Sequence, residues 1–405
     1  MYNFEKMALE ASKDFIEWRK LFHQYPELSF EEVNTTKKIV EILKDIGYEE
    51  IRVGIPLFPQ TGVIAELNPG KKGKCVAIRS DIDALPVNEQ TDVSYKSNIP
   101  GVMHACGHDA HIAMLLGVAK VLYSIKDEID GNVKLIFQPG EENNKPGVTD
   151  KTGARLLYED SDELNDIDAV FGLHVWGTLP SGVICYRPGP MMTTNMVANL
   201  EIEGVGGHGA MPHTCVDPII IACQIVNAWQ TIVSREVNPL DMSVLTVGKI
   251  ESEGSWNIIP DKASLICGVR TLNFDLIQEI RDRMKEIAEG IGKSMRANII
   301  FNALIGVPPV VNDEKLTKMA VQSVEKAIGK ENTMLIDPVM PSEDFSWYQK
   351  AAPGVLFFLG IGDESKGTNY AQHHPKYKVD DDALSNGVAA ILSATFDFIN
   401  NPGIQ

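Results

Sequence analysis

The chain has 405 residues, a length that favours two domains over one. Its 55 acidic against 37 basic residues give a formal net charge of −18, which argues against nucleic acid or an anionic membrane as a partner. Hydrophobic residues make up 44% of the chain, enough for a substantial core.

The cysteines and the N-terminal segment indicate the compartment. None of the six cysteines forms a CxxC pair, which is typical of mostly buried thiols in a reducing environment. Residues 1–20 are charged and amphipathic, unlike a signal peptide, and no run of 18 apolar residues occurs. We therefore expect a cytoplasmic protein.

The first half of the chain alternates helices with strands. Apolar residues recur at helical spacing in 4–23 and 34–46. The segment 109–125 is apolar almost all round and predicts a buried helix. Short β-rich runs occupy 62–67, 75–79, 133–138 and 169–174. This alternation predicts an α/β fold with a largely parallel sheet.

The pattern changes near residues 188–190. Three half-exposed strands are predicted at 196–204, 242–251 and 263–271, with helices beginning at Pro218 and Phe274. This β-α-β-β-α-β-like order over 190–304 predicts an inserted ferredoxin-like domain. Residues 1–189 and 305–405, which end in a helix near 381–399, then form one larger α/β domain around the insert.

The densest group of chemically active side chains lies at residues 104–111, just before the buried helix. Cys106 and His108 are two positions apart and can bind one cation, because Gly107 lets the backbone bend tightly between them. His111 follows one turn along, and we expect a supporting rather than a ligating role for it.

Two adjacent carboxylates, Glu141 and Glu142, follow the apolar strand 133–138. Side chains of neighbouring residues in an extended segment point in opposite directions, so one could bind a metal while the other faces a water. Ligands gather at the carboxyl ends of strands in α/β sheets, which favours a functional role for this pair.

Other strand ends carry residues of the same kind. His174 follows an apolar strand, and either His373 or His374 could bind a metal near the C-terminus. Asp83 follows another strand and could orient a ligating imidazole, since metal-bound histidines commonly donate their second N–H to a carboxylate.

The insert contains a glycine-rich turn, residues 204–213, that exposes His208. The turn lacks the spacing of a dinucleotide or phosphate loop, so a contact with a substrate or a transition state fits it better. Asn257 and Arg270 are candidates for holding a substrate carbonyl and carboxylate, because an arginine fork matches carboxylate geometry.

In combination, these runs resemble the metallopeptidases of peptidase family M20. The similarity is greatest to the amidohydrolase subfamily of aminoacylases, hippurate hydrolases and auxin-conjugate hydrolases. It covers nearly the whole chain and rests, in order, on DIDALP (81–86), HACGHDAH (104–111), QPGEE (138–142), GLHVW (172–176), GGHGAMPH (206–213), SEDF (342–345) and HHP (373–375).

The resemblance implies a zinc-peptidase-like catalytic domain and a lid and dimerisation domain at 190–304, hence a homodimer or dimer-based oligomer. It implies two divalent metal ions, zinc or manganese, with Glu141 as general base and Asp83 as supporting carboxylate. His208 would reach a catalytic site, often that of the partner subunit, while Asn257 and Arg270 would contact the substrate. The implied metal ligands are Cys106, His108, Glu142, His174 and His373.

The expected reaction is metal-dependent hydrolysis of the amide bond of a small N-acyl amino acid by an activated water. Within the same family, N-acetyl-diaminopimelate deacetylation and small-dipeptide hydrolysis are alternatives. The residues also admit a Cys106 nucleophile activated by His108, or an inactive metal-binding dimeric scaffold. Residues 143–150 form a longer, more polar loop than the family's glycine-rich connection, which leaves the substrate open.

Overall fold

The structure, a computed structural model, describes residues 2–400. The chain divides into two compact units, each described by itself. The first contains residues 2–189, 311–337 and 344–400, and the second contains 190–310 and 338–343. All six cysteines are free thiols. Among residues 2–400, every helix is too short or too polar to cross a membrane.

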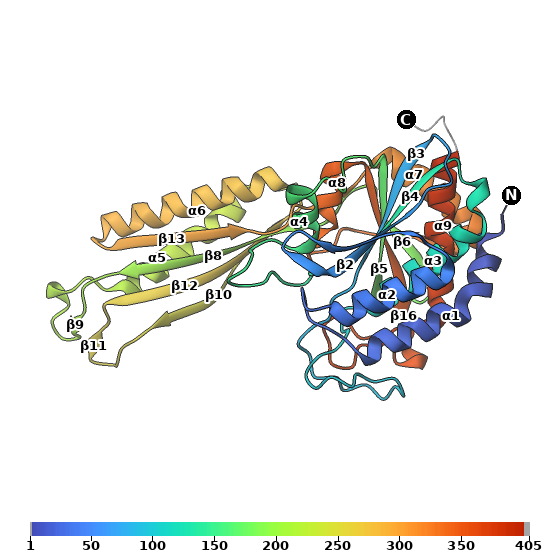
Figure 1. Cartoon of the computed structure of the whole chain (residues 1–405). Helices are drawn as coiled ribbons and strands as arrows, with labels where there is room; N and C mark the ends of the chain where they lie inside the picture. The colour runs from blue at the N-terminus through green and yellow to red at the C-terminus, as the bar shows by residue number, and fades with distance from the viewer. Residues whose placement is uncertain (1, 401–405) are drawn as a thin grey trace. The chain divides into compact units, whose positions relative to one another are not determined.

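The first unit is built on an eight-stranded sheet (Figure 1). Its four central strands, β4, β3, β5 and β16, are parallel to one another. The edge strands pair mostly antiparallel, so the sheet is mixed, and the largely parallel centre matches the expected fold class. In sheet order the strands are β1 (Glu50–Ile55), β2 (Phe58–Leu67), β4 (Gly131–Gln138), β3 (Lys74–Asp81), β5 (Ala169–Pro180), β16 (Gly354–Gly362), β6 (Ile184–Tyr186) and β15 (Thr333–Leu335).

Helices lie on both faces of this sheet. Figure 1 shows α3 and α9 on one side, with α1 packed against both, and α4 and α8 on the other. Helix α3 is buried along almost its whole length, as its all-round apolar sequence predicts. The helices are α1 (Phe4–Gln24), α2 (Val33–Ile46), α3 (His108–Ser124), α4 (Gly153–Asp160), α7 (Glu314–Ile328), α8 (Tyr348–Ala351) and α9 (Leu384–Asn400).

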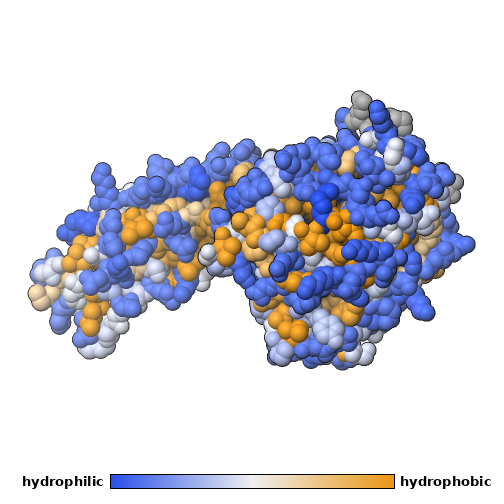
Figure 2. Space-filling view, viewed as in Figure 1, coloured by the Kyte–Doolittle hydropathy of each residue, from blue (hydrophilic) through white to orange (hydrophobic). Residues whose placement is uncertain are grey.

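The second unit has the β-α-β-β-α-β order of a ferredoxin-like fold. Its antiparallel sheet has the order β10-β12-β8-β13, and its two helices bury their apolar residues in one shared core with the sheet. Figure 2 shows hydrophilic residues along the outer side of α6. The elements are β8 (Thr194–Glu203), α5 (Pro218–Thr231), β10 (Ser243–Ser252), β12 (Lys262–Thr271), α6 (Phe274–Ser294) and β13 (Asn298–Ile305).

Three differences from the sequence expectation stand out. Strand β1 was not predicted, because its residues are mostly exposed and carry little apolar pattern. The second unit extends beyond the expected insert 190–304 to residue 310 and includes residues 338–343. Two short strands, β7 (Gly189–Met192) and β14 (Val310–Asn312), occur in the sequence where the chain passes from one unit to the other.

Candidate metal centre

His108 is the first residue of α3 and is fully buried. The preceding Gly107 has φ of 86°, and a Cβ there would overlap Val175 and lie 2.8 Å from the Tyr377 hydroxyl. Only glycine therefore fits between Cys106 and His108, as the tight bend required. The bend brings the Cys106 thiol and the His108 imidazole to the same place.

Asp83 holds the His108 ring from behind. His108 Nδ1 lies 2.9 Å from the backbone oxygen of Asp83 and 3.2 Å from its Oδ1. With an ion bound, Nδ1–H would donate to Asp83 and leave the Nε2 lone pair for the ion. Oδ2 of the same carboxylate accepts the backbone N–H of Glu142 at 3.0 Å. One carboxylate thus fixes two of the predicted ligand residues.

Glu141 and Glu142 follow the end of β4 through a Pro139–Gly140 turn in which Gly140 has φ of 61°. The expectation that their side chains point in opposite directions was wrong. Each places a carboxylate oxygen within 4.8 Å of the other and of a His108 nitrogen. The turn ends the extended backbone at Gln138, so the alternation of a strand no longer applies at these two residues.

His174 lies on β5 and is buried. Its Nδ1 is 2.7 Å from the backbone oxygen of Val175, and its Nε2 is 3.5 Å from the Cys106 sulfur. Burial and the neighbouring His111 together lower the pKa of His174 well below its ordinary value, so the ring is neutral. A neutral imidazole with a free Nε2 lone pair has the form that binds metals.

Of the two C-terminal histidines, His373 is the one beside the other candidates. Its Nε2 lies 3.3 Å from Glu142 Oε1, and its backbone N–H donates to the Ala105 oxygen at 2.8 Å. His374 instead stacks on Tyr370 and accepts the Lys376 N–H with its Nδ1.

The predicted ligands therefore converge from four separate stretches of the chain. Their side chains form three overlapping sets of three residues. In each set, every residue has one possible metal-binding atom, and these atoms lie within 4.8 Å of one another. These groups contain all five predicted ligands together with Glu141. They are Cys106–His108–His174, Cys106–Glu142–His373 and His108–Glu141–Glu142.

The donor atoms of this cluster fit a divalent cation. His108 Nε2 and Glu142 Oε1 are buried 3.9 Å apart, and His108 Nε2 has no hydrogen-bond partner within residues 2–400. Burial lowers the pKa of His108, but the carboxylates of Asp81 and Asp83 outweigh it and raise the pKa to about 10. That excess of negative charge, with thiol and imidazole donors, suits zinc or a similar ion.

His111 is occupied in a different way. Its Nδ1 contacts Asp81 Oδ1 at 2.5 Å, and its Nε2 accepts the Val175 N–H at 2.9 Å. With both nitrogens bonded, His111 supports the centre from the side, as its position one turn along α3 predicts.

Sequence reasoning missed the buried charges that surround these groups. Arg79 donates to Asp81 and to Asp344, both at 2.8 Å. Arg19 and His23 of α1 both contact Asp109, the residue after His108. Apart from Arg79 and Asp81, which are two positions apart, these partners are 86 to 265 positions apart in the sequence. The runs DIDALP, HACGHDAH and SEDF contain the acidic partners Asp81, Asp109 and Asp344, but no run contains Arg79, Arg19 or His23.

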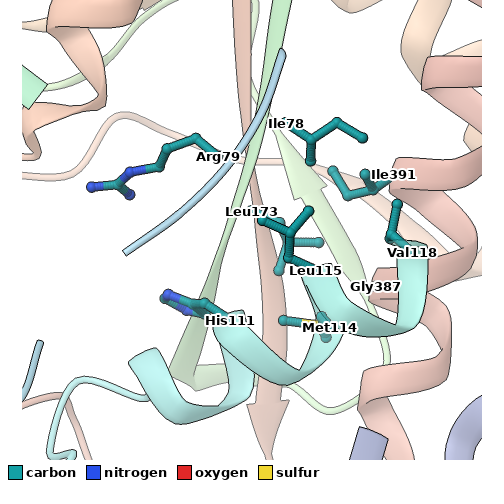
Figure 3. Close-up of a pocket in the computed structure, with 9 residues that line it drawn as sticks. All are labelled: Ile78, Arg79, His111, Met114, Leu115, Val118, Leu173, Gly387 and Ile391. Atoms are coloured by element: carbon teal, nitrogen blue, oxygen red, sulfur yellow. The ribbon is translucent and has the colours of Figure 1, made fainter. Parts of the chain in front are cut away.

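A small cavity of about 20 Å³ lies beside His111 in the first unit. Figure 3 shows apolar side chains of the sheet, α3 and α9 gathered around it, while the Arg79 guanidinium points away. Its volume is about that of one water, and its lining is mostly apolar. It is therefore a packing gap of the core and too small for a substrate.

The other three predicted site residues belong to the second unit. His208 is exposed on β9 (Gly207–His208), which pairs with β11 (Ile258–Ile259). Its Nδ1 accepts the Ala210 N–H at 3.0 Å, so its proton is on Nε2. Asn257 is half-buried, and its backbone oxygen accepts the Gly209 N–H. Arg270 donates from Nη1 to the Met340 oxygen and the Ser342 hydroxyl.

Known proteins resemble this chain over nearly its full length. It is 40% identical to thermostable carboxypeptidase 1 of Saccharolobus solfataricus, with 95% of each chain covered. It is 40% identical to the N-acetyl-L-cysteine deacetylase of Bacillus subtilis, over 92% of this chain and 85% of that one. The crystal structure of a dinuclear metal-binding M20 peptidase from Bacillus subtilis matches with a TM-score of 0.81 at 32% identity, covering 96% and 99%.

The family model described as peptidase family M20/M25/M40 matches residues 77–396. That range includes every one of the predicted ligands, the whole second unit and most of the first. The proteins of this family are hydrolases that act on amide bonds. The chain belongs to peptidase family M20/M25/M40.

Proposed function

We propose that the protein hydrolyses the amide bond of small N-acyl amino acids with the help of two divalent ions, zinc or manganese. Cys106, His108, Glu142, His174 and His373 would hold the ions. The observation that carries the proposal is the convergence of these donors, with Glu141 among them, at the carboxyl ends of the central strands. The carboxypeptidase and deacetylase relatives support an amide whose product is a free amino acid.

The ions would supply Lewis-acid chemistry, polarising the scissile carbonyl and lowering the pKa of the attacking water. Other residues of the chain orient the metal-binding nitrogen atoms of the histidines. Asp83 fixes the His108 ring through Nδ1, and the Val175 oxygen fixes His174 in the same way. Both rings therefore present Nε2 toward the centre. Such partners keep the ligand tautomer and orientation constant.

Glu141 is the proposed proton carrier. Its carboxylate lies within 4.8 Å of donor atoms of His108 and Glu142, close enough to share one water with them. In the reaction it accepts the proton of the attacking water and then delivers it to the departing amine. Glu142, whose backbone is fixed by Asp83, is the better placed of the two to remain a ligand.

Three residues of the second unit are the proposed substrate contacts. His208 has its proton on Nε2 and can donate a hydrogen bond to the oxyanion that forms at the carbonyl oxygen. Asn257 would hold the acyl oxygen, and Arg270 the substrate carboxylate, which needs a local cation in a chain of net charge −18. We propose that His208 acts within a homodimer or a dimer-based oligomer.

A Cys106 nucleophile is the weaker alternative. Burial and the carboxylates of Glu142 and Glu141 raise the pKa of the Cys106 thiol well above its ordinary value, so the free thiol is a poor nucleophile at neutral pH. A bound cation would instead stabilise its thiolate.

A substrate screen tests the proposal. The protein is loaded with Mn²⁺ or Zn²⁺ and given N-acetyl, N-benzoyl and indoleacetyl amino acids, N-acetyl-diaminopimelate and dipeptides. We expect hydrolysis of at least one N-acyl amino acid, lost with EDTA and restored by the ion. Hydrolysis that survives EDTA but stops after thiol alkylation would favour the Cys106 nucleophile. No hydrolysis of any compound would favour the inactive scaffold.

A further inference from the structure

The segment Leu28–Glu32, between α1 and α2, contains none of the predicted ligands but contacts Asp83, which supports His108, and the turn that leads to Glu142. Leu28 forms a parallel bridge with Ala84, next to Asp83. Ser29, Phe30 and Glu32 are all buried, and Glu32 is completely inaccessible. A loop that buries a carboxylate and a hydroxyl has a structural or functional reason to do so.

Ser29 determines how the Asp83 carboxylate is turned. Its hydroxyl donates to Asp83 Oδ2 at 2.7 Å, and the same oxygen accepts the Glu142 N–H at 3.0 Å. With Oδ2 held by these two donors, Oδ1 is the oxygen that faces His108 Nδ1. Ser29 thus fixes the group that fixes the His108 ring.

Glu32 and Phe30 hold the turn that leads to Glu141 and Glu142. Glu32 Oε1 accepts the Gly140 N–H at 2.9 Å. The Phe30 ring occupies the space where a Cβ of Gly140 would be, and it stacks on Phe58 with ring centroids 4.1 Å apart. Gly140 is therefore held by a hydrogen bond and by an aromatic ring, which fixes the direction in which the chain leaves β4.

We propose that Ser29 and Glu32 are positioning residues of the metal centre, a role that rests on the proposed function. Ser29 orients the Asp83 carboxylate behind His108, and Glu32 holds the turn that delivers the two glutamates. Neither touches the substrate or an ion. Removing such a supporting hydrogen bond weakens metal binding or activity by roughly 10- to 100-fold.

Ser29→Ala and a matched control test the first contact. The control is Ser323→Ala, because the Ser323 hydroxyl is also buried and donates to a carboxylate, Asp397 Oδ2 at 2.6 Å, between α7 and α9. Mn²⁺ affinity is measured by competition with a fluorescent chelator, and the visible spectrum of the Co²⁺-loaded protein reports ligand geometry. We expect Ser29→Ala to weaken Mn²⁺ binding roughly 10- to 100-fold and to shift the Co²⁺ spectrum. Ser323→Ala should change neither.

Glu32→Gln and Glu32→Ala test the second contact without relying on Ser29. The glutamine keeps an oxygen that can accept the Gly140 N–H, so its Mn²⁺ affinity should stay within about threefold of wild type, whereas alanine should lose roughly tenfold or more. Equal affinities for wild type, Ser29→Ala and Glu32→Ala would overturn the proposal. Equal losses in Ser29→Ala and Ser323→Ala would also overturn it.

Failure of the positioning role can be told apart from failure of the proposed function. A wild-type protein that hydrolyses N-acyl amino acids, with a Ser29→Ala variant that binds Mn²⁺ normally, overturns the positioning role alone. A wild-type protein that hydrolyses none of them, with weakened Mn²⁺ binding in Ser29→Ala, overturns the substrate assignment and supports the positioning role.

Discussion

His108 Nδ1 lies 2.9 Å from the backbone oxygen and 3.2 Å from the carboxylate of Asp83, so one residue holds the ring twice. In Asp83→Asn the backbone oxygen still accepts the Nδ1–H. The variant loses the negative charge that strengthens the binding of the imidazole Nε2 to a metal ion. We expect metal affinity or turnover to fall roughly 10- to 100-fold. Chelator competition with Mn²⁺ measures the affinity. Unchanged affinity and turnover would mean that the backbone contact alone is sufficient.

Replacing each of the two adjacent glutamates should affect a different property of the protein, either its turnover or its metal content. Glu141→Ala is expected to keep its metal and lose turnover by about 10²–10⁴, because it removes a proton carrier. Glu142→Ala is expected to lose bound metal. Metal content by mass spectrometry and turnover are measured on the same preparations. Loss of metal from the Glu141 variant, with retention in the Glu142 variant, would exchange the two roles.

His208→Ala should reduce turnover by about 10²–10³ while metal content stays at the wild-type level, since it removes one oxyanion donor. His213→Ala is the control, because His213 is exposed on the short 3-10 helix Pro212–Thr214 that follows the same turn.

Mixing the His208→Ala and Glu141→Ala proteins tests whether His208 acts on the partner subunit of a dimer. Recovery of activity in the mixture indicates that His208 serves the partner subunit, and no recovery indicates its own.

Acid stability should depend on Glu89. Burial raises the pKa of this carboxyl, but hydrogen bonds from His23, the Thr91 hydroxyl and the Ser97 N–H outweigh it and lower the pKa. A carboxyl whose pKa is lower in the folded state adds stability above its unfolded pKa of about 4.3 and loses it as pH falls through the folded value. Glu89→Gln should therefore lose less stability than wild type between about pH 6 and pH 3. Urea unfolding at both pH values measures this difference, and equal losses would contradict it.

Truncating a core side chain beside the small cavity should reduce the stability of the fold. Leu115 is buried on α3 and lines the 20 Å³ cavity. Leu115→Ala should therefore reduce the free energy of unfolding by about 2–5 kcal/mol. Leu9→Ala on α1 is the control, because Leu9 is 64% exposed, and it should change stability by less than about 0.5 kcal/mol. Urea unfolding distinguishes the two, and similar losses in both would contradict the prediction.

The sequence was informative wherever chemistry follows a regular element. Cys106 and His108 lie at the start of an apolar helix, and Glu142 follows a strand, so pattern and chemistry coincide there. The family resemblance chose His373 over His374, and the structure places His373 beside Glu142. The direction of the Glu141 side chain could not be predicted, because it depends on the backbone of the Pro139–Gly140 turn.

Supporting contacts between distant segments were the least predictable part. Ser29 and Asp83 are 54 positions apart, and Arg79 and Asp344 are 265 apart. A serine in a loop or an arginine in a strand has many possible partners, and the packing of the folded sheet selects one of them. Edge strand β1 was missed for a related reason, because its pairing with β2 leaves most of its side chains exposed.

The candidate ligands Cys106 and His373 are separated by more than half of the chain, although their donor atoms lie within 4.8 Å of each other. An ion bound to both would join the two ends of a very long loop in the way that a disulfide does. Closing such a loop restricts the unfolded chain, and a ligand that binds only the folded state raises the melting temperature with its concentration. Metal starvation should therefore make the protein easier to digest with a protease as well as less active.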